Sequence, residues 1–262
     1  MRFLDRSGAS DIEDAVRKTV NELRAAASAT GPCAGISAPP YDPAAFAFHL
    51  GVTRVRAADL GYAGHATYAD EGLTIEYDKY SGHRARHRFT IAHEVGHIIL
   101  AQVSGDARKL GYRSPKSEVE RLCNKLAAEI LTPAAEIMAL WKSGRSQPGW
   151  HRPNFVIQVA TAYSVSLEMA ALRIVELCDP AMGVILLDDS TRTWNWAHGA
   201  FPRVAVNAAL LAMFAEGTRR AADPPETTGH ATINVSLRQS MKMVPISWTQ
   251  LASKLCLITL QY

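Results

Sequence analysis

Apolar residues recur at helical spacing in three stretches of the first half of the chain. The first predicts an amphipathic helix over residues 10–28, with Ser10 or Asp11 as its N-cap. A short helix is expected over residues 44–50, where a proline opens it and a glycine ends it. Residues 118–131 carry an unbroken i, i+3, i+4 apolar stripe that stops before a proline, which predicts another helix.

Residues 52–88 show a strand-like pattern, in which short β-branched and aromatic runs are separated by glycine-rich turns. We expect a small sheet there, followed by a helix in the apolar stretch after it. Arg84, Arg86 and Arg88 alternate with other residues and would share one face of the last strand. A solvated face is the favoured explanation, and a substrate-facing patch is the alternative.

The middle of the chain predicts two further helices, near residues 154–163 and 167–177, in a helix-turn-helix outline. Residues 141–153, rich in glycine, serine, proline and basic residues, indicate a linker before them. Arg173 is the only basic residue of the helical pair, which equips it poorly for phosphate contacts. We therefore favour a packing element and expect no direct nucleic-acid binding.

The pattern changes after residue 181. Residues 183–187 and 191–196 predict a β-hairpin, and residues 202–216 predict a helix. Alternating apolar residues over 233–237 indicate another strand. These elements suggest a small mixed α/β domain, and its sequence contains no cluster of histidine, cysteine or acidic residues that would indicate a chemistry.

Composition fits a soluble globular protein, because 48% of the 262 residues are hydrophobic. A net charge of +3 is too small to indicate nucleic acid or a membrane as partner. The four cysteines form no C-x-x-C pair, which favours free thiols in a reducing compartment. Because the chain starts without a signal-like segment and contains no run of about 18 apolar residues, we expect a cytoplasmic protein.

The candidate chemistry lies in an H-E-x-x-H motif formed by His93, Glu94 and His97. Four residues make a little over one helical turn, so both histidines project from one face and can reach the same cation. Glu94 is rotated from them by about 100°. It would therefore stand outside the ligand set but reach a nearby water as general base.

A site of this kind needs a third protein ligand. The downstream candidates are Glu118, Glu120, Glu129, Glu136 and His151. Glu120 lies at the border of the apolar stripe of its helix, so it can turn toward a neighbouring helix. In the alternative explanation, Ser117 and Glu120 form a capping box at the helix start. Tyr112, His151 and Tyr163 are the candidates for stabilising an oxyanion, and nothing in the sequence separates them.

Three motifs, at residues 40–52, 88–97 and 120–133, occur together in the order and spacing of a known family. Through them the chain resembles the ImmA/IrrE family of metallopeptidases, over roughly residues 40–177. The resemblance implies that His93, His97 and Glu120 bind a metal ion and that Glu94 is catalytic. It does not extend to the C-terminal part, and residues 130–133 read Ile-Leu-Thr-Pro where the family usually has Leu-Leu-Met-Pro.

We therefore expect an α+β fold with a zincin-like metallopeptidase core over residues 1–143. A helix-turn-helix-like helical hairpin would follow over residues 144–180, and a mixed α/β domain over residues 181–262 could sense a signal or form a homodimer. The bound ion would be zinc, with manganese as the alternative.

The resemblance implies a metalloendopeptidase that cuts a helix-turn-helix repressor of the phage-repressor type once, and so releases stress-response or mobile-element genes. In the alternative function, the core is a non-proteolytic docking module that binds a repressor or an antitoxin. An intact Glu94 argues against that alternative, because a scaffold would not require the catalytic acid.

Overall fold

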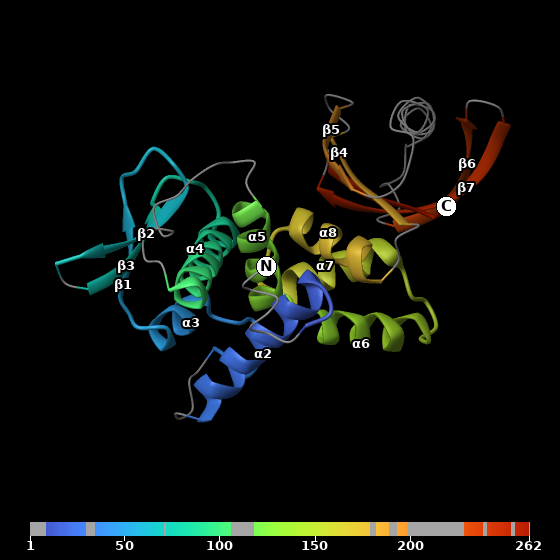
Figure 1. Ribbon diagram of the computed structural model, residues 1–262. Coiled ribbons are helices and arrows are strands. Elements are labelled where there is room, and N and C mark those ends of the chain that lie inside the picture. The colour runs from blue at the N-terminus through green and yellow to red at the C-terminus, as the bar shows by residue number, and fades with distance from the viewer. Residues whose placement is uncertain are drawn as a thin grey trace. The chain divides into compact units, whose positions relative to one another are not determined.

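The computed structural model describes residues 9–29, 35–70, 72–105, 118–178, 182–188, 193–198, 228–237, 240–252 and 255–261 (Figure 1). These residues form seven helices and eight strands. The helices are α2 Ile12–Ala29, α3 Pro43–His49, α4 Arg84–Ser104, α5 Glu118–Leu131, α6 Ala134–Arg145, α7 Arg152–Tyr163 and α8 Leu167–Leu177. The strands are β1 Val52–Ala58, β2 Gly64–Ala69, β3 Gly72–Asp78, β4 Met182–Asp188, β5 Thr193–His198, β6 Thr228–Leu237, β7 Ser240–Ala252 and β8 Leu255–Gln261.

The chain divides into two compact units. Unit 1 comprises Met1–Glu136 and Ala160–Ser166, and unit 2 comprises Ile137–Val159 and Leu167–Tyr262. Unit 1 is α+β, as expected, and is compatible with a zincin-like core.

Unit 1 contains a three-stranded sheet in the order β1-β3-β2. Strand β1 runs parallel to β3, whereas β2 runs antiparallel to it. Helix α4 lies against β2 and β3, and α5 packs along α4 (Figure 1). Ile75 of β3 and Ile98 of α4 are both buried, as apolar residues on facing elements of a core should be.

The first two helices confirm their sequence predictions and show how local chemistry starts a helix. Asp11 is the N-cap of α2, because its Oδ1 accepts from the backbone N–H of Asp14 at 2.8 Å. Asp42 caps α3 in the same way and accepts from the N–H of Ala44 at 3.0 Å. Pro43 follows at the first helical position, where its missing N–H costs no hydrogen bond.

The prediction of a strand running through Arg84, Arg86 and Arg88 is wrong. These residues form the start of α4, which follows His83 in extended conformation. A period of two in a short polar run does not distinguish an exposed strand from the first turns of a helix. Here the side chain of Arg88 turns inward and is only 8% exposed, which an alternating pattern could not indicate.

The linker predicted over residues 141–153 is also wrong, because α6 continues to Arg145. Trp141 is buried, and its ring lies 5.0 Å from that of Trp150 and 5.3 Å from that of Phe155. The turn-forming residues that suggested a linker occupy only the short connection between α6 and α7. Aromatic burial therefore overrides the local composition within unit 2.

Helices α7 and α8 form the helical pair that the sequence predicts. No single described helix is long and apolar enough to span a membrane, and α7 and α8 meet that test only as a pair bent by 115°. Arg173, the one basic residue of the predicted pair, is 9% exposed.

The C-terminal strands form a five-stranded sheet in unit 2, in the order β5-β4-β8-β7-β6 with antiparallel neighbours. The predicted hairpin is present as the β4–β5 pair. Helix α8 contacts β4 and β5. The helix predicted over residues 202–216 lies outside the described residues.

Candidate metal centre

Helix α4 places the two histidines of the H-E-x-x-H motif side by side. The rings of His93 and His97 are 4.9 Å apart, and their Nε2 atoms are 3.2 Å apart. The spacing of four residues on one helix therefore brings both imidazoles to a common point, as the sequence predicts.

Helix α5 supplies a carboxylate at that point. Oε2 of Glu120 lies 3.1 Å from Nε2 of His93, and its Oε1 lies 3.4 Å from Nε2 of His97. In a tetrahedral zinc site with ligand bonds of about 2.0 to 2.1 Å, neighbouring ligand atoms stand about 3.3 Å apart. The three separations fit that value, so the donor set suits a single divalent ion.

Asn124, one turn after Glu120 on α5, orients the first histidine. Its Oδ1 lies 2.8 Å from Nδ1 of His93, so that nitrogen carries the proton and donates. Nε2 of His93, the nitrogen left to bind a metal ion, then faces the Glu120 carboxylate and His97. Because these acceptor atoms converge, a cation between them would satisfy all three, and the Asn124 contact is the usual outer support of a metal-binding histidine.

Gly96 allows the two helices to approach closely enough for this geometry. A Cβ atom added at Gly96 would lie 3.0 Å from the Cα and 3.2 Å from the carbonyl oxygen of Cys123. Both are backbone atoms of α5, which cannot rotate away. The absence of a side chain at Gly96 thus sets the distance between the two helices that carry the candidate ligands.

The residues of the centre differ in their exposure to solvent. His97 and Glu94 are each 3% exposed, whereas the side chains of His93 and Glu120 are 16% and 18% exposed. A buried acid beside a partly open ligand set is what a catalytic metal site needs, because a water and a substrate must reach the ion from one side.

Cys123 also lies at the centre. Its Sγ and one ring nitrogen from each of His93 and His97 lie within 4.8 Å of one another. The Glu120 oxygens lie 3.1 and 3.4 Å from the imidazole nitrogens, which makes Glu120 the stronger candidate for the third ligand. Burial, followed by the nearby charges of Glu120 and Glu94, raises the pKa of the Cys123 thiol, which favours its neutral form when no cation is near.

The other candidates for the third ligand have different roles or surroundings. The Glu118 side chain is 95% exposed. Glu129 accepts from the backbone N–H of Ala134 at 3.1 Å and so holds the start of α6. His151 is buried in unit 2, and Glu136 belongs to a separate polar cluster of unit 1.

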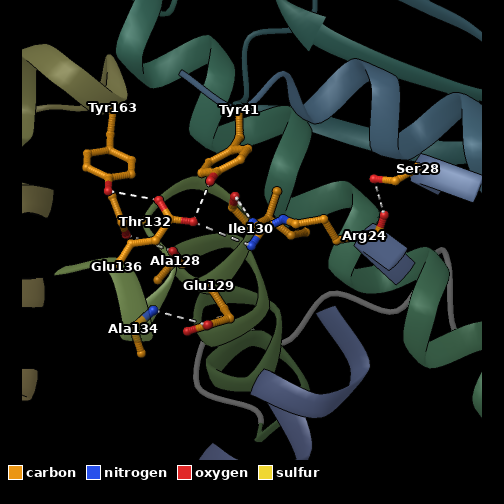
Figure 2. Close-up of polar contacts among 10 residues, drawn as sticks. All are labelled: Arg24, Ser28, Tyr41, Ala128, Glu129, Ile130, Thr132, Ala134, Glu136 and Tyr163. Carbon is orange, nitrogen blue, oxygen red and sulfur yellow. Dashed lines mark hydrogen bonds and ion pairs between the residues drawn. The ribbon is translucent and has the colours of Figure 1, made fainter. Parts of the chain in front are cut away.

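Glu136 binds two tyrosines and an arginine (Figure 2). The hydroxyl of Tyr41 donates to one carboxylate oxygen, and that of Tyr163 donates to the other at 2.9 Å. The guanidinium of Arg24 lies 3.9 Å from the carboxylate and 4.2 Å from the centre of the Tyr41 ring. Burial, then the Glu136 contact, raises the pKa of Tyr41 to about 12 and also raises that of Tyr163.

The contacts of Glu136 affect which residue can stabilise an oxyanion. The Tyr163 proton is already donated to Glu136, so that side chain is not available to an oxyanion in this conformation. Tyr112 lies outside the described residues, and His151 belongs to the other unit.

Sequence reasoning missed the roles of Asn124, Gly96 and Arg88. Asn124 follows Glu120 by four residues, about one helical turn, and that spacing was the available signal. Gly96 could have been noticed as a glycine inside a helix, where the residue is costly without a packing reason. The local sequence pattern did not indicate that Arg88 would be buried.

A small mixed sheet packed on a helix that carries H-E-x-x-H, with a carboxylate from the next helix, is an arrangement compatible with zincin-like peptidases. Residues 52–175 match a family model described as Peptidase_M78, the IrrE N-terminal-like domain. Over residues 52–175 this match confirms the resemblance to the ImmA/IrrE family of peptidases that the motifs indicate.

One solved structure, described as a Mycobacterium tuberculosis transcriptional regulator, aligns over 99% of this chain and 90% of its own. The TM-score is 0.52 and the sequence identity is 13%, so the likeness shows the fold alone. No curated protein matches the chain.

Proposed function

We propose that this protein is a metal-dependent endopeptidase in which His93, His97 and Glu120 hold one zinc ion. The observation that carries the proposal is the convergence of the three donor groups, with separations of 3.1, 3.2 and 3.4 Å. Two imidazoles and a carboxylate suit zinc, and manganese remains the alternative because it also accepts such a set.

When bound, zinc polarises the scissile carbonyl and lowers the pKa of a water at the site toward 7. Glu94 would take the proton from that water and later pass it to the leaving amine. Its carboxylate is 3% exposed, so bulk water competes little for it. Asn124 keeps the His93 ring in place, and the exposed side of His93 and Glu120 admits the substrate.

As substrate we propose a helix-turn-helix repressor of the phage-repressor type, cut at one site in the cytoplasm to release stress-response or mobile-element genes. The match of residues 52–175 to the IrrE N-terminal-like domain supports this choice. The similar fold of a protein described as a transcriptional regulator is consistent with a role in gene control. The protein itself would contact the repressor and would bind neither nucleic acid nor a membrane directly.

The experiment compares wild type with Glu94→Gln, which removes the base but keeps the shape of the side chain. Each protein is mixed with the repressor encoded next to its gene, with and without a chelator, and fragments are followed by mass spectrometry. We expect one metal-dependent cut made by wild type alone, because loss of a general base costs about 10² to 10⁴ in rate. If both proteins relieve repression equally and no fragment appears, the docking function replaces the peptidase.

We further propose the division into a peptidase core at 1–143, a helical segment at 144–180 and a sensing or dimerising domain at 181–262. A chain ending at Cys178 should retain metal binding and lose regulation or dimerisation. It should also be less stable in α8, because the truncation removes the β4 and β5 residues that contact this helix. Loss of all helical circular dichroism on truncation would contradict the division.

A further inference from the structure

Cys123 is a buried thiol at the candidate metal centre to which the proposed reaction gives no role. The residue is fully buried and lies on α5, three positions after Glu120. Residues three apart share a helix face, so Cys123 faces α4 together with the carboxylate. Its Sγ groups with a nitrogen of His93 and a nitrogen of His97, with all three atoms within 4.8 Å of one another.

The backbone holds the thiol at this place. The backbones of α4 and α5 approach closely at Gly96 and Cys123, because an added Cβ at Gly96 would meet the Cys123 backbone at 3.0 Å. The Cα atom of Cys123 therefore cannot move away from the histidines unless α4 and α5 separate. A side chain at position 123 is positioned at the centre by the same packing that positions Glu120.

The distance from sulfur to the imidazoles is short enough for coordination after a small adjustment. A tetrahedral zinc with bonds of about 2.3 Å to sulfur and 2.0 to 2.1 Å to nitrogen keeps these atoms about 3.6 Å apart. The sulfur–nitrogen distances are at most 4.8 Å, which exceeds this tetrahedral separation by no more than about 1.2 Å. Rotation about the single side-chain bond of a cysteine moves its sulfur on this scale.

We propose that Cys123 is an additional ligand of the ion in this chain and that it makes the centre selective for zinc over manganese. The inference rests on the metal centre of the proposed function. When the ion binds, a sulfur–metal bond forms and the thiol proton leaves to solvent, with no oxidation or reduction. Thiolate is a soft donor that zinc accepts and manganese disfavours, and zinc can still take a water as a fifth ligand.

Cobalt(II) serves as the probe, because it occupies zinc sites and shows a sulfur-to-metal charge-transfer absorption only when a thiolate is bound. The full-length metal-free protein is titrated with cobalt(II) under reducing, anaerobic conditions. We expect this absorption in wild type and in Cys178→Ala, the matched control in which a cysteine of unit 2 is removed. Cys123→Ala and Cys123→Ser should bind one cobalt but lack the absorption.

A competition between zinc and manganese gives the second readout. The preference of Cys123→Ala for zinc should fall at least about tenfold relative to wild type, since even a change outside the ligand set commonly costs that much affinity. A chain that keeps Cys123 as its only cysteine, with Cys33, Cys178 and Cys256 changed to serine, should retain the absorption. This variant keeps the test decisive if the Cys123 variants do not fold.

The outcomes separate the two proposals. If wild type binds one cobalt without the sulfur absorption, or if Cys123→Ala shows the wild-type spectrum, Cys123 is not a ligand and the His93, His97 and Glu120 centre stands. If wild type binds no divalent ion at all, the metal centre of the proposed function fails with it.

Discussion

Nδ1 of His93 lies 2.8 Å from Oδ1 of Asn124, and this contact fixes which nitrogen of the histidine faces the metal centre. With Nδ1 donating to Asn124, Nε2 faces the centre and stands 3.1 Å from the Glu120 carboxylate. Glu120 and Asn124 lie four residues apart on α5, so one helix face supplies both a proposed ligand and the support of another.

We predict that Asn124→Ala lowers metal affinity by about 10- to 100-fold, as loss of an outer support of a metal-binding histidine commonly does. Asn124→Asp should restore part of the affinity, because its carboxylate can accept the same hydrogen bond. Isothermal titration with zinc measures the effect. Arg121→Ala is the control, since its side chain is 71% exposed on the same helix. Equal affinities for Asn124→Ala and wild type would contradict the assigned role.

Gly96→Ala should separate α4 from α5 by a few tenths of an ångström, because the added Cβ would meet the Cys123 backbone at 3.0 to 3.2 Å. We expect zinc affinity to fall by about tenfold or more, although alanine has a better helix propensity than glycine by about 1 kcal/mol. Gly96→Ser should weaken binding further. Zinc titrations of wild type, Gly96→Ala and Gly96→Ser measure the three affinities. If the affinities are equal, or if they rise with the size of the side chain, the distance between the helices does not control metal binding.

Arg88 ties three separate segments of unit 1 together. Its guanidinium donates to the carbonyl oxygens of Tyr41 and Tyr163 and, at 3.2 Å, to that of Ser164. Ser164 has a φ of 51°, a left-handed conformation that a residue with a side chain adopts at a cost. The Arg88 contact therefore holds a strained turn against the start of α4.

Arg88→Lys should destabilise the fold by about 1.5 to 3 kcal/mol, because an ammonium group cannot reproduce the fork of hydrogen bonds. Thermal and urea unfolding measure the change in the free energy of unfolding. Arg86→Lys is the matched control, as Arg86 is exposed on the same helix and should change stability by less than about 0.5 kcal/mol. Equal effects of the two substitutions would refute the bridging role.

The Tyr41–Glu136 contact predicts a loss of stability in alkali. Tyr41 has a folded pKa raised to about 12, above its unfolded value near 10, so the folded state binds the proton more tightly. Its contribution is fully present below about pH 10 and is lost as the pH rises from there toward 12.

Tyr41→Phe removes that hydrogen bond and should cost about 1.5 to 3 kcal/mol at neutral pH, since the acceptor is a carboxylate. The difference in unfolding free energy between wild type and Tyr41→Phe should narrow between pH 10 and 11. Urea unfolding at several pH values measures it, and a constant difference across that range would count against the assignment.

The amino-acid sequence determined those features of the protein that depend on neighbours along the chain. The apolar stripe of residues 118–131 matches α5 from its first residue to its last, and Asp42 with Pro43 defined the start of α3. The pairing of His93 with His97 also follows from helical spacing alone. Each of these features is set by hydrogen bonds and side-chain directions within a turn or two.

The tertiary structure decided what depends on distances between segments. It brought Glu120 and not Glu118 to the histidines, gave Asn124 a role, and buried Arg88 against carbonyl groups 47 to 76 residues away. It also extended α6 into the first part of the predicted linker, because Trp141 packs on rings that follow it in sequence. Local periodicity cannot encode these outcomes, since they depend on how closely two helices approach, and at the metal centre that approach is set by the missing side chain of Gly96.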